Sequence, residues 1–189
     1  MAERLIVGVS GASGAPLAVE LLRQLRDSHP EIETHLVVSR GGALTLRQEC
    51  GMELDELKVL ASVFHESGAI GASIASGSFP TMGMVVVPCS MKTVAGIVSG
   101  YSDNLLLRAA DVCLKERRKL VLVARESPLS AVHLHNLCEA SQLGAVIVPP
   151  MLAYYNHPGT VGEMTRYIVR RILSQFGLGG DGYQWEGME

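Results

Sequence analysis

Short apolar runs alternate with amphipathic stretches along the chain. The apolar runs are rich in β-branched residues and are not interrupted by polar ones, which is typical of strands covered on both faces. They predict five strands, at residues 5–10, 34–39, 84–88, 120–124 and 145–148. Apolar positions between these runs recur with helical spacing, so we expect helices at residues 16–28, 42–50, 93–100, 105–117, 131–143 and 161–176.

This alternation predicts an α/β fold with a Rossmann-like, doubly wound parallel sheet. Residues 1–177 are expected to form a single domain. In such sheets ligands bind beyond the carboxyl ends of the strands, at the point where the strand order reverses. Residues 178–189 contain the single tryptophan, Trp185. We expect this tail to leave the core and pack on a neighbouring subunit.

Composition narrows the class of protein. The chain has 189 residues, of which 48% are hydrophobic and 19% charged, which suits a globular domain with a substantial core. A formal net charge of -3 argues against a general nucleic-acid binder. No apolar run approaches the roughly 20 residues that span a bilayer, and the N-terminus lacks the layout of a signal peptide. We therefore expect a cytoplasmic protein that does not associate with membranes.

The cysteine and histidine spacings indicate neither a disulfide framework nor a metal site. The four cysteines form no CxxC pair and are expected to be buried free thiols: Cys50, Cys89, Cys113 and Cys138. His133 and His135 lie two residues apart in a predicted helix, where their side chains point to different faces. We expect no bound metal.

A turn of small residues, 11–16, follows the first predicted strand. A strand that opens into a helix through such a turn leaves backbone N–H groups free at the positive end of the helix, where a phosphate can bind. The glycines at positions 8, 11 and 14 match neither a dinucleotide fingerprint, nor a P-loop, nor a nucleophile elbow. The turn is either a phosphate cradle of another type or only a tight connection.

Polar residues also follow two later strands. Ser90, Lys92 and Thr93 place hydroxyl and ammonium donors at a helix start. Two such turns facing each other across one parallel sheet favour a mononucleotide site, and flavin mononucleotide suits it because it has one phosphate and an apolar ring. Arg125 and Glu126 follow the fourth predicted strand. They are either a surface ion pair or part of the site, and their place at the carboxyl edge favours the site.

Five ordered motifs resemble those of the flavin prenyltransferases, the UbiX family, over about residues 3–177. They are the GxSGASGA start, Ser39, PCSMKT, RAADVCLKERRKLVLVARESPL and GAVIVPPMLAYYNHP. The resemblance implies a dodecamer with active sites between subunits. It also implies a metal-free reaction in which dimethylallyl monophosphate alkylates reduced FMN at N5 and then at C6. The product, prenylated FMN, would pass to a UbiD-type decarboxylase.

The resemblance also implies the roles of individual residues. Flavin contacts fall on Gly11, Ala12, Ser13, Ser39, Ser90, Met91, Lys92, Thr93 and Arg125. Contacts to the prenyl phosphate fall on Tyr155 and Arg171, with Lys115 and Glu126 close by. The catalytic set is Ser13, Glu49, Lys115 and Glu126. The chain has no Asp-rich magnesium motif, so fixed cations and hydroxyl donors are expected to stabilise the leaving phosphate.

Two other functions compete with this interpretation. A flavoprotein cysteine decarboxylase would share the fold, but it would carry a PASANT-like string where this chain has PCSMKT. A non-catalytic FMN-binding subunit that stabilises an aromatic acid decarboxylase by contact would also need the flavin residues. It would not need the residues assigned to the prenyl phosphate.

Overall fold

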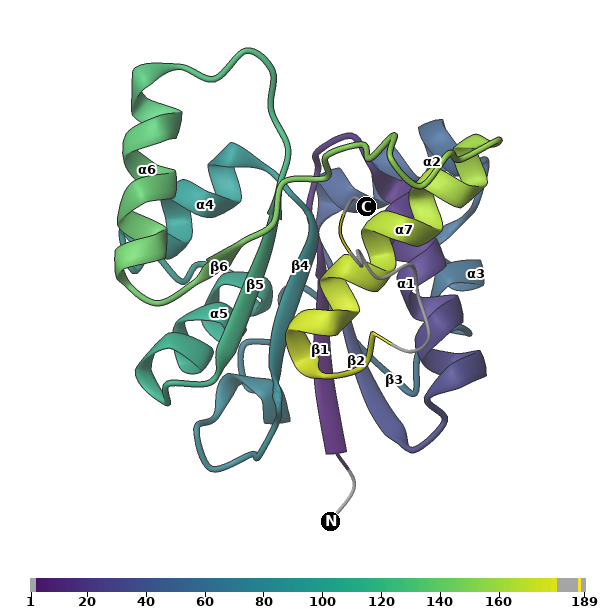
Figure 1. The fold of residues 1–189 in the computed structure, drawn as a ribbon. Helices are drawn as coiled ribbons and strands as arrows, with labels where there is room; N and C mark the ends of the chain where they lie inside the picture. The colour runs from purple at the N-terminus through teal and green to yellow at the C-terminus, as the bar shows by residue number, and fades with distance from the viewer. Residues whose placement is uncertain (1–2, 180–186, 188–189) are drawn as a thin grey trace.

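The structure is a computed structural model that describes residues 3–179 and residue 187. Its strands form one parallel sheet in the order β3-β2-β1-β4-β5-β6 (Figure 1). The strands are β1 (Glu3–Val9), β2 (Ile32–Val38), β3 (Val63–His65), β4 (Gly83–Cys89), β5 (Lys119–Ala124) and β6 (Val146–Ile147). Because β1 pairs with both β2 and β4, the strand order reverses between β1 and β4, which makes this the topological switch point.

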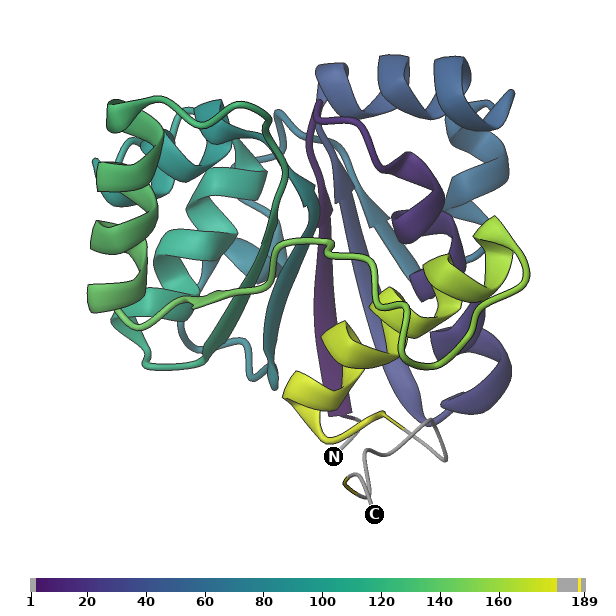
Figure 2. The same cartoon turned by 45° about the horizontal axis from the view of Figure 1, so that its top comes forward.

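Helices cover both faces of the sheet (Figure 2). One face packs against α1 (Ala15–Ser28), α2 (Arg40–Cys50), α3 (Leu54–Lys58) and α7 (Val161–Leu173). The other packs against α4 (Met91–Val98), α5 (Leu105–Lys115) and α6 (Ala131–Gln142). Two 3₁₀ turns, Ser73–Ala75 and Ser174–Phe176, complete the described elements.

Alternating strand residues build two cores. In β1, Leu5, Val7 and Val9 belong to the cluster under α1 and α7, whereas Ile6 belongs to the cluster under α4 and α5. Successive strand side chains point to opposite faces, so a strand buried on both sides must be apolar throughout. This explains why the apolar runs in the sequence do not alternate with polar residues.

The predicted fold class and single domain are confirmed. All five predicted strands and six predicted helices are present, with ends that differ by up to three residues. The sequence prediction missed β3 and α3. The strand β3 is a three-residue edge strand and α3 has five residues, so neither is long enough to show a period.

The chain crosses the sheet after β6. Residues 148–160 run from the side of α6 to the opposite side, where α7 packs on α1 (Figure 1). This crossover brings Tyr155 beside Tyr167 of α7. After α7, Leu178 packs against the core and its carbonyl oxygen lies 3.0 Å from Nε2 of His29. Trp185 lies outside the described residues, so the packing of the tail remains a prediction.

Two of the four cysteines are buried as expected, Cys89 and Cys113. Cys50 is half-buried and Cys138 is exposed, which corrects the expectation that all four are buried. Burial raises the pKa of the Cys113 thiol to about 12. Within residues 3–179 we find no helix both long and apolar enough to cross a membrane, and no cluster of three potential metal ligands.

A histidine pair joins β2 to β3, with His35 buried and His65 half-buried. Nδ1 of His35 lies 2.9 Å from Nε2 of His65, and Nε2 of His35 lies 2.7 Å from the Glu33 carboxylate. If His35 donates to Glu33, its Nδ1 must accept from His65 while both rings are neutral. Burial is the largest cause that lowers the pKa of each imidazole. Both lowered pKa values favour neutral rings in the native state at neutral pH.

We expect this pair to make stability depend on pH. Each folded-state pKa is depressed, so the unfolded chain binds more protons below its ordinary histidine pKa of about 6.5. The stabilisation is complete above that value and is lost as the pH falls through the folded-state pKa values.

The variant His65→Gln tests this prediction, because a glutamine side chain can still donate to His35 but does not titrate. Urea midpoints between pH 7.5 and 5 should fall less steeply in His65→Gln than in the wild type, and equal slopes would contradict this explanation.

Candidate functional site at the strand switch point

Three helix starts converge at the carboxyl edge of the sheet. The Ser39 hydroxyl accepts from the Gly42 amide at 3.0 Å and begins α2, and the Ser90 hydroxyl accepts from the Thr93 amide at 3.3 Å and begins α4. Asn104 caps α5 in the same way, with its side-chain oxygen 3.1 Å from the Leu107 amide. A polar cap fits each position because the first helical N–H groups have no partner within the helix. The three positive helix ends therefore share one region.

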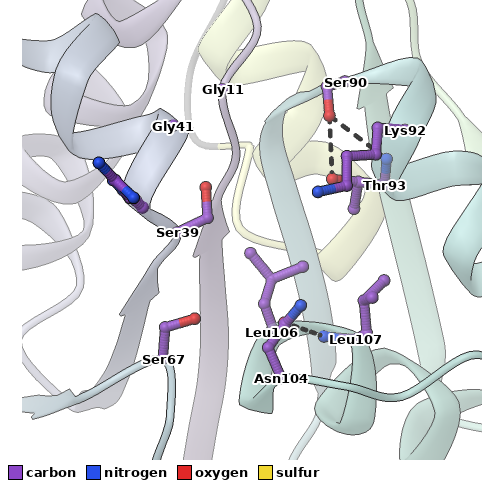
Figure 3. A pocket seen from close by; sticks show the side chains of 11 residues that line it. Gly11, Ser39, Gly41, Ser67, Ser90, Lys92, Thr93, Asn104, Leu106 and Leu107 are labelled. Carbon is purple, nitrogen blue, oxygen red and sulfur yellow. Dashed lines mark hydrogen bonds between the residues drawn. The ribbon is translucent and has the colours of Figure 1, made fainter.

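A cavity of about 450 Å³ lies between these helix starts (Figure 3). Its lining residues are Gly11, Ser39, Arg40, Gly41, Ser67, Ser90, Lys92, Thr93, Asn104, Leu106 and Leu107. Ser39 and Ser67 approach it from the β2 side, and Ser90, Lys92 and Thr93 approach it from α4 (Figure 3). The cavity therefore has a cation and hydroxyls on each of two sides, Arg40 at the start of α2 and Lys92 at the start of α4, together with two leucines. Such a lining suits a ligand that is part anion and part apolar.

The backbone forms the narrow wall of this cavity. A Cβ atom on Gly11 would stand 2.9 Å from Cα of Gly41, and one on Gly41 would stand 3.1 Å from Cα of Gly11. Only glycine at both positions lets the loop after β1 lie against the start of α2. This close contact leaves the backbone of Gly11 and Gly41 lining the cavity.

Ser10 joins the loop after β1 to the end of β4. Its hydroxyl donates to the Pro88 carbonyl at 2.9 Å and accepts from the Ser90 amide at 2.7 Å. Ser10 is almost completely buried, so both hydrogen bonds are shielded from water. Ser10 therefore fixes the relative position of the two strand ends that flank the cavity. The sequence pattern placed it in the first strand and gave no sign of this role.

The start of α1 is occupied by a side chain of the protein itself. The Gly14 and Ala15 amides donate to one carboxylate oxygen of Glu49, at 2.9 and 2.8 Å. The turn of small residues indicated that these amides are free for a phosphate, and the structure corrects that expectation. Glu49 comes from the last turn of α2, and no local pattern could have linked it to residues 35 positions earlier. The helix starts that face the cavity are those of α2, α4 and α5.

Glu49, Ser13 and Arg125 form one electrostatic cluster. Burial acts to raise the pKa of Glu49, but hydrogen bonds from the Ser13 side chain and from the Gly14 and Ala15 amides outweigh it, and the Arg125 charge adds to them. The net effect is a lowered pKa. Glu49 is therefore ionised at neutral pH and holds the loop after β1 in place.

We expect Glu49→Ala to loosen this loop. At a pH above the ordinary pKa of a carboxyl group, the hydrogen bonds to the ionised Glu49 stabilise the folded state fully. This stabilisation is lost as the pH falls through the lowered pKa of Glu49. At pH 7, hydrogen exchange at the Gly14 and Ala15 amides should be roughly tenfold faster in Glu49→Ala. Mass spectrometry of the peptide that contains them measures this rate. Glu31→Ala, in the turn before β2, is the matched control, and equal exchange in both variants would contradict the role of Glu49.

The other predicted flavin residues are close to the cavity but differ in exposure. Ala12 and Met91 are buried in the turns that flank it and do not line it. Arg125 is exposed, and its amide donates to the Cys89 carbonyl at 3.0 Å. The carboxylate of Glu126 accepts from the Ser127 amide at 3.0 Å. Arg125 and Glu126 thus lie directly after β5, at the same edge of the sheet as the cavity.

Tyr155 and Arg171 lie together, as predicted. Both line a pocket of about 290 Å³ between the crossover and α7. Tyr167 lines it too, and its hydroxyl is hydrogen-bonded to that of Tyr155. Pro149, Met151 and other apolar residues form the rest of the wall. A guanidinium and two phenols beside an apolar surface are suited to an organic phosphate.

Lys115 is not near either pocket within one chain. The helix α5 begins at the cavity and ends 11 residues later at Lys115, about 15 Å further along its axis. There the ammonium pairs with the Glu116 carboxylate, at the edge of the sheet where β5 begins. A single chain therefore does not bring Lys115 to the Tyr155–Arg171 pocket, and its place beside the prenyl phosphate of an assembly stays a prediction. Only another copy of the chain can bring Lys115 to such a site.

The structure adds residues that the sequence analysis did not select for the site. Those at the cavity are Arg40, Gly41, Ser67, Asn104, Leu106 and Leu107, and Tyr167 is added at the second pocket. Among them, Asn104 carries a signal that sequence alone can offer, because it is an asparagine directly before the predicted helix at residues 105–117. Ser67 follows β3, the strand that the periodicity missed, so its place could not be inferred.

Comparison with known proteins matches nearly the whole chain. The family model described as Flavoprotein matches residues 1–176. A probable UbiX-like flavin prenyltransferase from Sedimentibacter hydroxybenzoicus is 51% identical over 185 residues, covering 97% of each chain. The flavin prenyltransferase UbiX of Escherichia coli strain K12 is 52% identical over 176 residues, covering 93% of each.

Solved structures show the same relationship. AnUbiX (PadA1), in complex with FMN and dimethylallyl pyrophosphate, is 44% identical with a TM-score of 0.96, and the match covers all of both chains. A dodecameric FMN-dependent UbiX-like decarboxylase from Escherichia coli O157:H7 is 51% identical with a TM-score of 0.94, over 97% of this chain and 100% of that one. The peptidyl-cysteine decarboxylase EpiD is 17% identical over 81% of this chain and 84% of that one, with a TM-score of 0.62, and shares the fold alone.

Proposed function

Because this chain belongs to the UbiX-like flavin prenyltransferases, we propose that it joins the dimethylallyl group of a dimethylallyl phosphate to reduced FMN. The observation that carries this proposal is the cavity at the switch point, with its helix starts, hydroxyls and two cations. When bound there, the reduced flavin supplies the nucleophilic N5 and C6 atoms that accept the dimethylallyl group.

The residues of the cavity fit FMN. Its volume of about 450 Å³ lies in the range of small-molecule sites. Ser90, Lys92 and Thr93, at the start of α4, would hold the phosphate through charge-assisted hydrogen bonds and the positive helix end. Leu106 and Leu107 would contact the apolar ring. We propose that Gly11 and Ser39 flank the flavin, with Ala12, Ser13, Met91 and Arg125 supporting the turns around it.

The second pocket fits the phosphate of the donor. Arg171 and the Tyr155 hydroxyl would bind it, each charge-assisted hydrogen bond contributing about 1.5–3 kcal/mol. They would stabilise the negative charge that develops as the allylic C–O bond breaks. We propose that Glu126 moves a proton close to this phosphate and that Glu49 holds Ser13 and the loop after β1 in position.

We propose that the complete site forms between copies of the chain. The cavity and the Tyr155–Arg171 pocket share no lining residue, and Lys115 lies at the opposite edge of the sheet. A relative that is 51% identical is dodecameric, which supports an assembly in which one copy supplies what another lacks. In such an assembly Lys115 would add a second cation, beside Arg171, at the donor phosphate.

We further propose that prenylated FMN leaves this protein for a UbiD-type decarboxylase. The alternative, a non-catalytic FMN-binding subunit, leaves Tyr155 and Arg171 without a role and requires a stable complex with the decarboxylase. The experiment incubates the protein anaerobically with reduced FMN and dimethylallyl phosphate and passes the mixture through a protein-retaining membrane. We expect the filtrate to activate an apo-decarboxylase. Activation that requires the protein itself would favour the alternative.

A further inference from the structure

The segment between β3 and β4 packs against the end of α5, where Lys115 pairs with Glu116. Gly77 is the point of closest approach. A Cβ atom on Gly77 would stand 2.7 Å from the carboxyl carbon of Glu116 and 2.8 Å from the ammonium nitrogen of Lys115. The ion pair therefore lies directly on the backbone of Gly77, in space that any side chain there would fill.

The segment that carries Gly77 is itself fixed. Ile74 is buried in the core beneath α4 and α5, and Phe79 packs against the same core. The guanidinium of Arg118 donates to the carbonyl oxygens of Gly77 and Phe79, the latter at 2.7 Å. Hydrogen bonds from a charged donor are stronger than those between neutral groups. Gly77 is therefore held in place both by the core and by Arg118.

The way in which α5 ends brings the charged side chains to this segment. Arg117 has a positive φ of 54°, and the Arg118 amide donates to the Cys113 carbonyl at 2.8 Å. A left-handed residue and a backward hydrogen bond of this kind end a helix. Lys115 remains in the last helical turn, whereas Arg118 follows the turn and reaches the carbonyl groups of the segment.

The ion pair contributes little to folding but leaves the ammonium able to bind a ligand. The Lys115 and Glu116 side chains are 45% and 36% exposed, and such surface pairs stabilise a fold only weakly. The pKa of Glu116 is lowered chiefly by its hydrogen bond with Lys115, and the Arg118 charge adds to this. Glu116 is therefore ionised at neutral pH. An ammonium has three N–H donors, so one can be held by Glu116 while the others contact a phosphate.

We infer that Gly77 and Glu116 are positioning residues, which fix the Lys115 ammonium for the donor phosphate bound to a neighbouring copy of the chain. This inference rests on the proposed function, in which Lys115 acts at that phosphate. A free lysine side chain loses conformational freedom when it is ordered at a ligand. An ammonium that is already held in place stabilises the charge on the leaving phosphate without first being reoriented.

Gly77→Ala is the most selective test, because the added methyl group meets the ends of two flexible side chains and no backbone atom among its nearest neighbours. Gly77 is outside the left-handed region, so alanine is compatible with its backbone. In anaerobic assays of the full-length protein, kcat/KM for dimethylallyl phosphate should fall about fivefold or more, because the ammonium is displaced. FMN affinity should not change. Gly71→Ala, in the same segment but with no neighbour within 4 Å, is the matched control and should change neither value.

A double-mutant cycle separates positioning of Lys115 from a general effect on the fold. In a Lys115→Gln background, Gly77→Ala should cause no further loss, because there is no ammonium to displace. Glu116→Ala provides a second, independent variant. It should lower kcat/KM in the wild type but not in the Lys115→Gln background, and Glu116→Gln should recover part of the loss because its amide oxygen still accepts from Lys115.

The outcomes distinguish this inference from the proposed function. Losses that are equal with and without Lys115 would overturn the inference, and so would an increase in activity with Glu116→Ala, which would mean that Glu116 competes with the donor phosphate. Wild-type activity of Lys115→Gln would overturn the inference and leave the proposed prenyl transfer intact. If the wild-type protein formed no prenylated flavin, both would be overturned.

Discussion

Replacing Arg171 with alanine is expected to lower kcat/KM for dimethylallyl phosphate by roughly 100-fold or more. Arg171 is the cation of the pocket that also contains Tyr155, and no carboxylate in the described part of the chain pairs with it. Its loss removes both the charge and the forked hydrogen bonds that stabilise the departing phosphate. Anaerobic formation of the prenylated flavin, followed by chromatography, measures the effect.

The controls separate this role from a general effect on folding. Arg171→Lys keeps the charge but not the forked geometry, so we expect it to recover only part of the activity. Arg171 does not line the cavity at the switch point, so the affinity for FMN should be unchanged in both variants. Full turnover by Arg171→Ala would remove Arg171 from the donor site.

Replacing Gly11 with alanine is expected to weaken FMN binding at least tenfold. The added Cβ would stand 2.9 Å from Cα and 3.1 Å from the carbonyl carbon of Gly41. Both contacts are with backbone, so the start of α2 must move for the methyl group to fit. That movement displaces Ser39 and Gly41 at the wall of the cavity. Fluorescence titration with FMN measures the affinity.

Gly68 provides the matched control for this substitution. It lies in the segment after β3, and a Cβ atom there would have no neighbour within 4 Å. Gly68→Ala should therefore bind FMN as the wild type does. If Gly11→Ala also bound FMN with wild-type affinity, the close contact between Gly11 and Gly41 would not shape the flavin site.

The periodicity of the sequence was sufficient to predict the fold because most elements are long and buried on one or two faces. The strand β4, for example, is buried at all seven positions, and its run of apolar residues has no other simple explanation. The elements that were missed, β3 and α3, are short and lie at the edge of the sheet. Nothing in their local pattern distinguishes them from loops.

The site was predictable where its residues follow a strand and begin a helix. Ser39 and Ser90 both do so and both line the cavity, whereas their contact with the flavin stays a prediction. Contacts between distant segments were not predictable in this way. The carboxylate of Glu49 reaches the start of α1 from the end of α2, which only the packing of the two helices brings about.

Lys115 shows the limit of assigning a site by motif. Its motif continues without interruption to Arg125 and Glu126, which suggests one shared site. The strand β5, however, lies between Lys115 and Arg125 in the sequence. The chain therefore passes from the amino end of the parallel strands to their carboxyl end before it reaches Arg125. Residues of one motif therefore lie at opposite ends of β5, and we expect a role for Lys115 at the donor to require a second copy.

The mass of the flavin recovered after an anaerobic reaction tests the central claim most directly. Wild-type protein is incubated with reduced FMN and dimethylallyl phosphate, and the flavin is extracted and analysed by mass spectrometry. We expect a flavin that is heavier by one five-carbon isoprenoid unit, and little of this product with Arg171→Ala. Recovery of unmodified FMN from the wild type, under conditions where both compounds are bound, would contradict the proposed function.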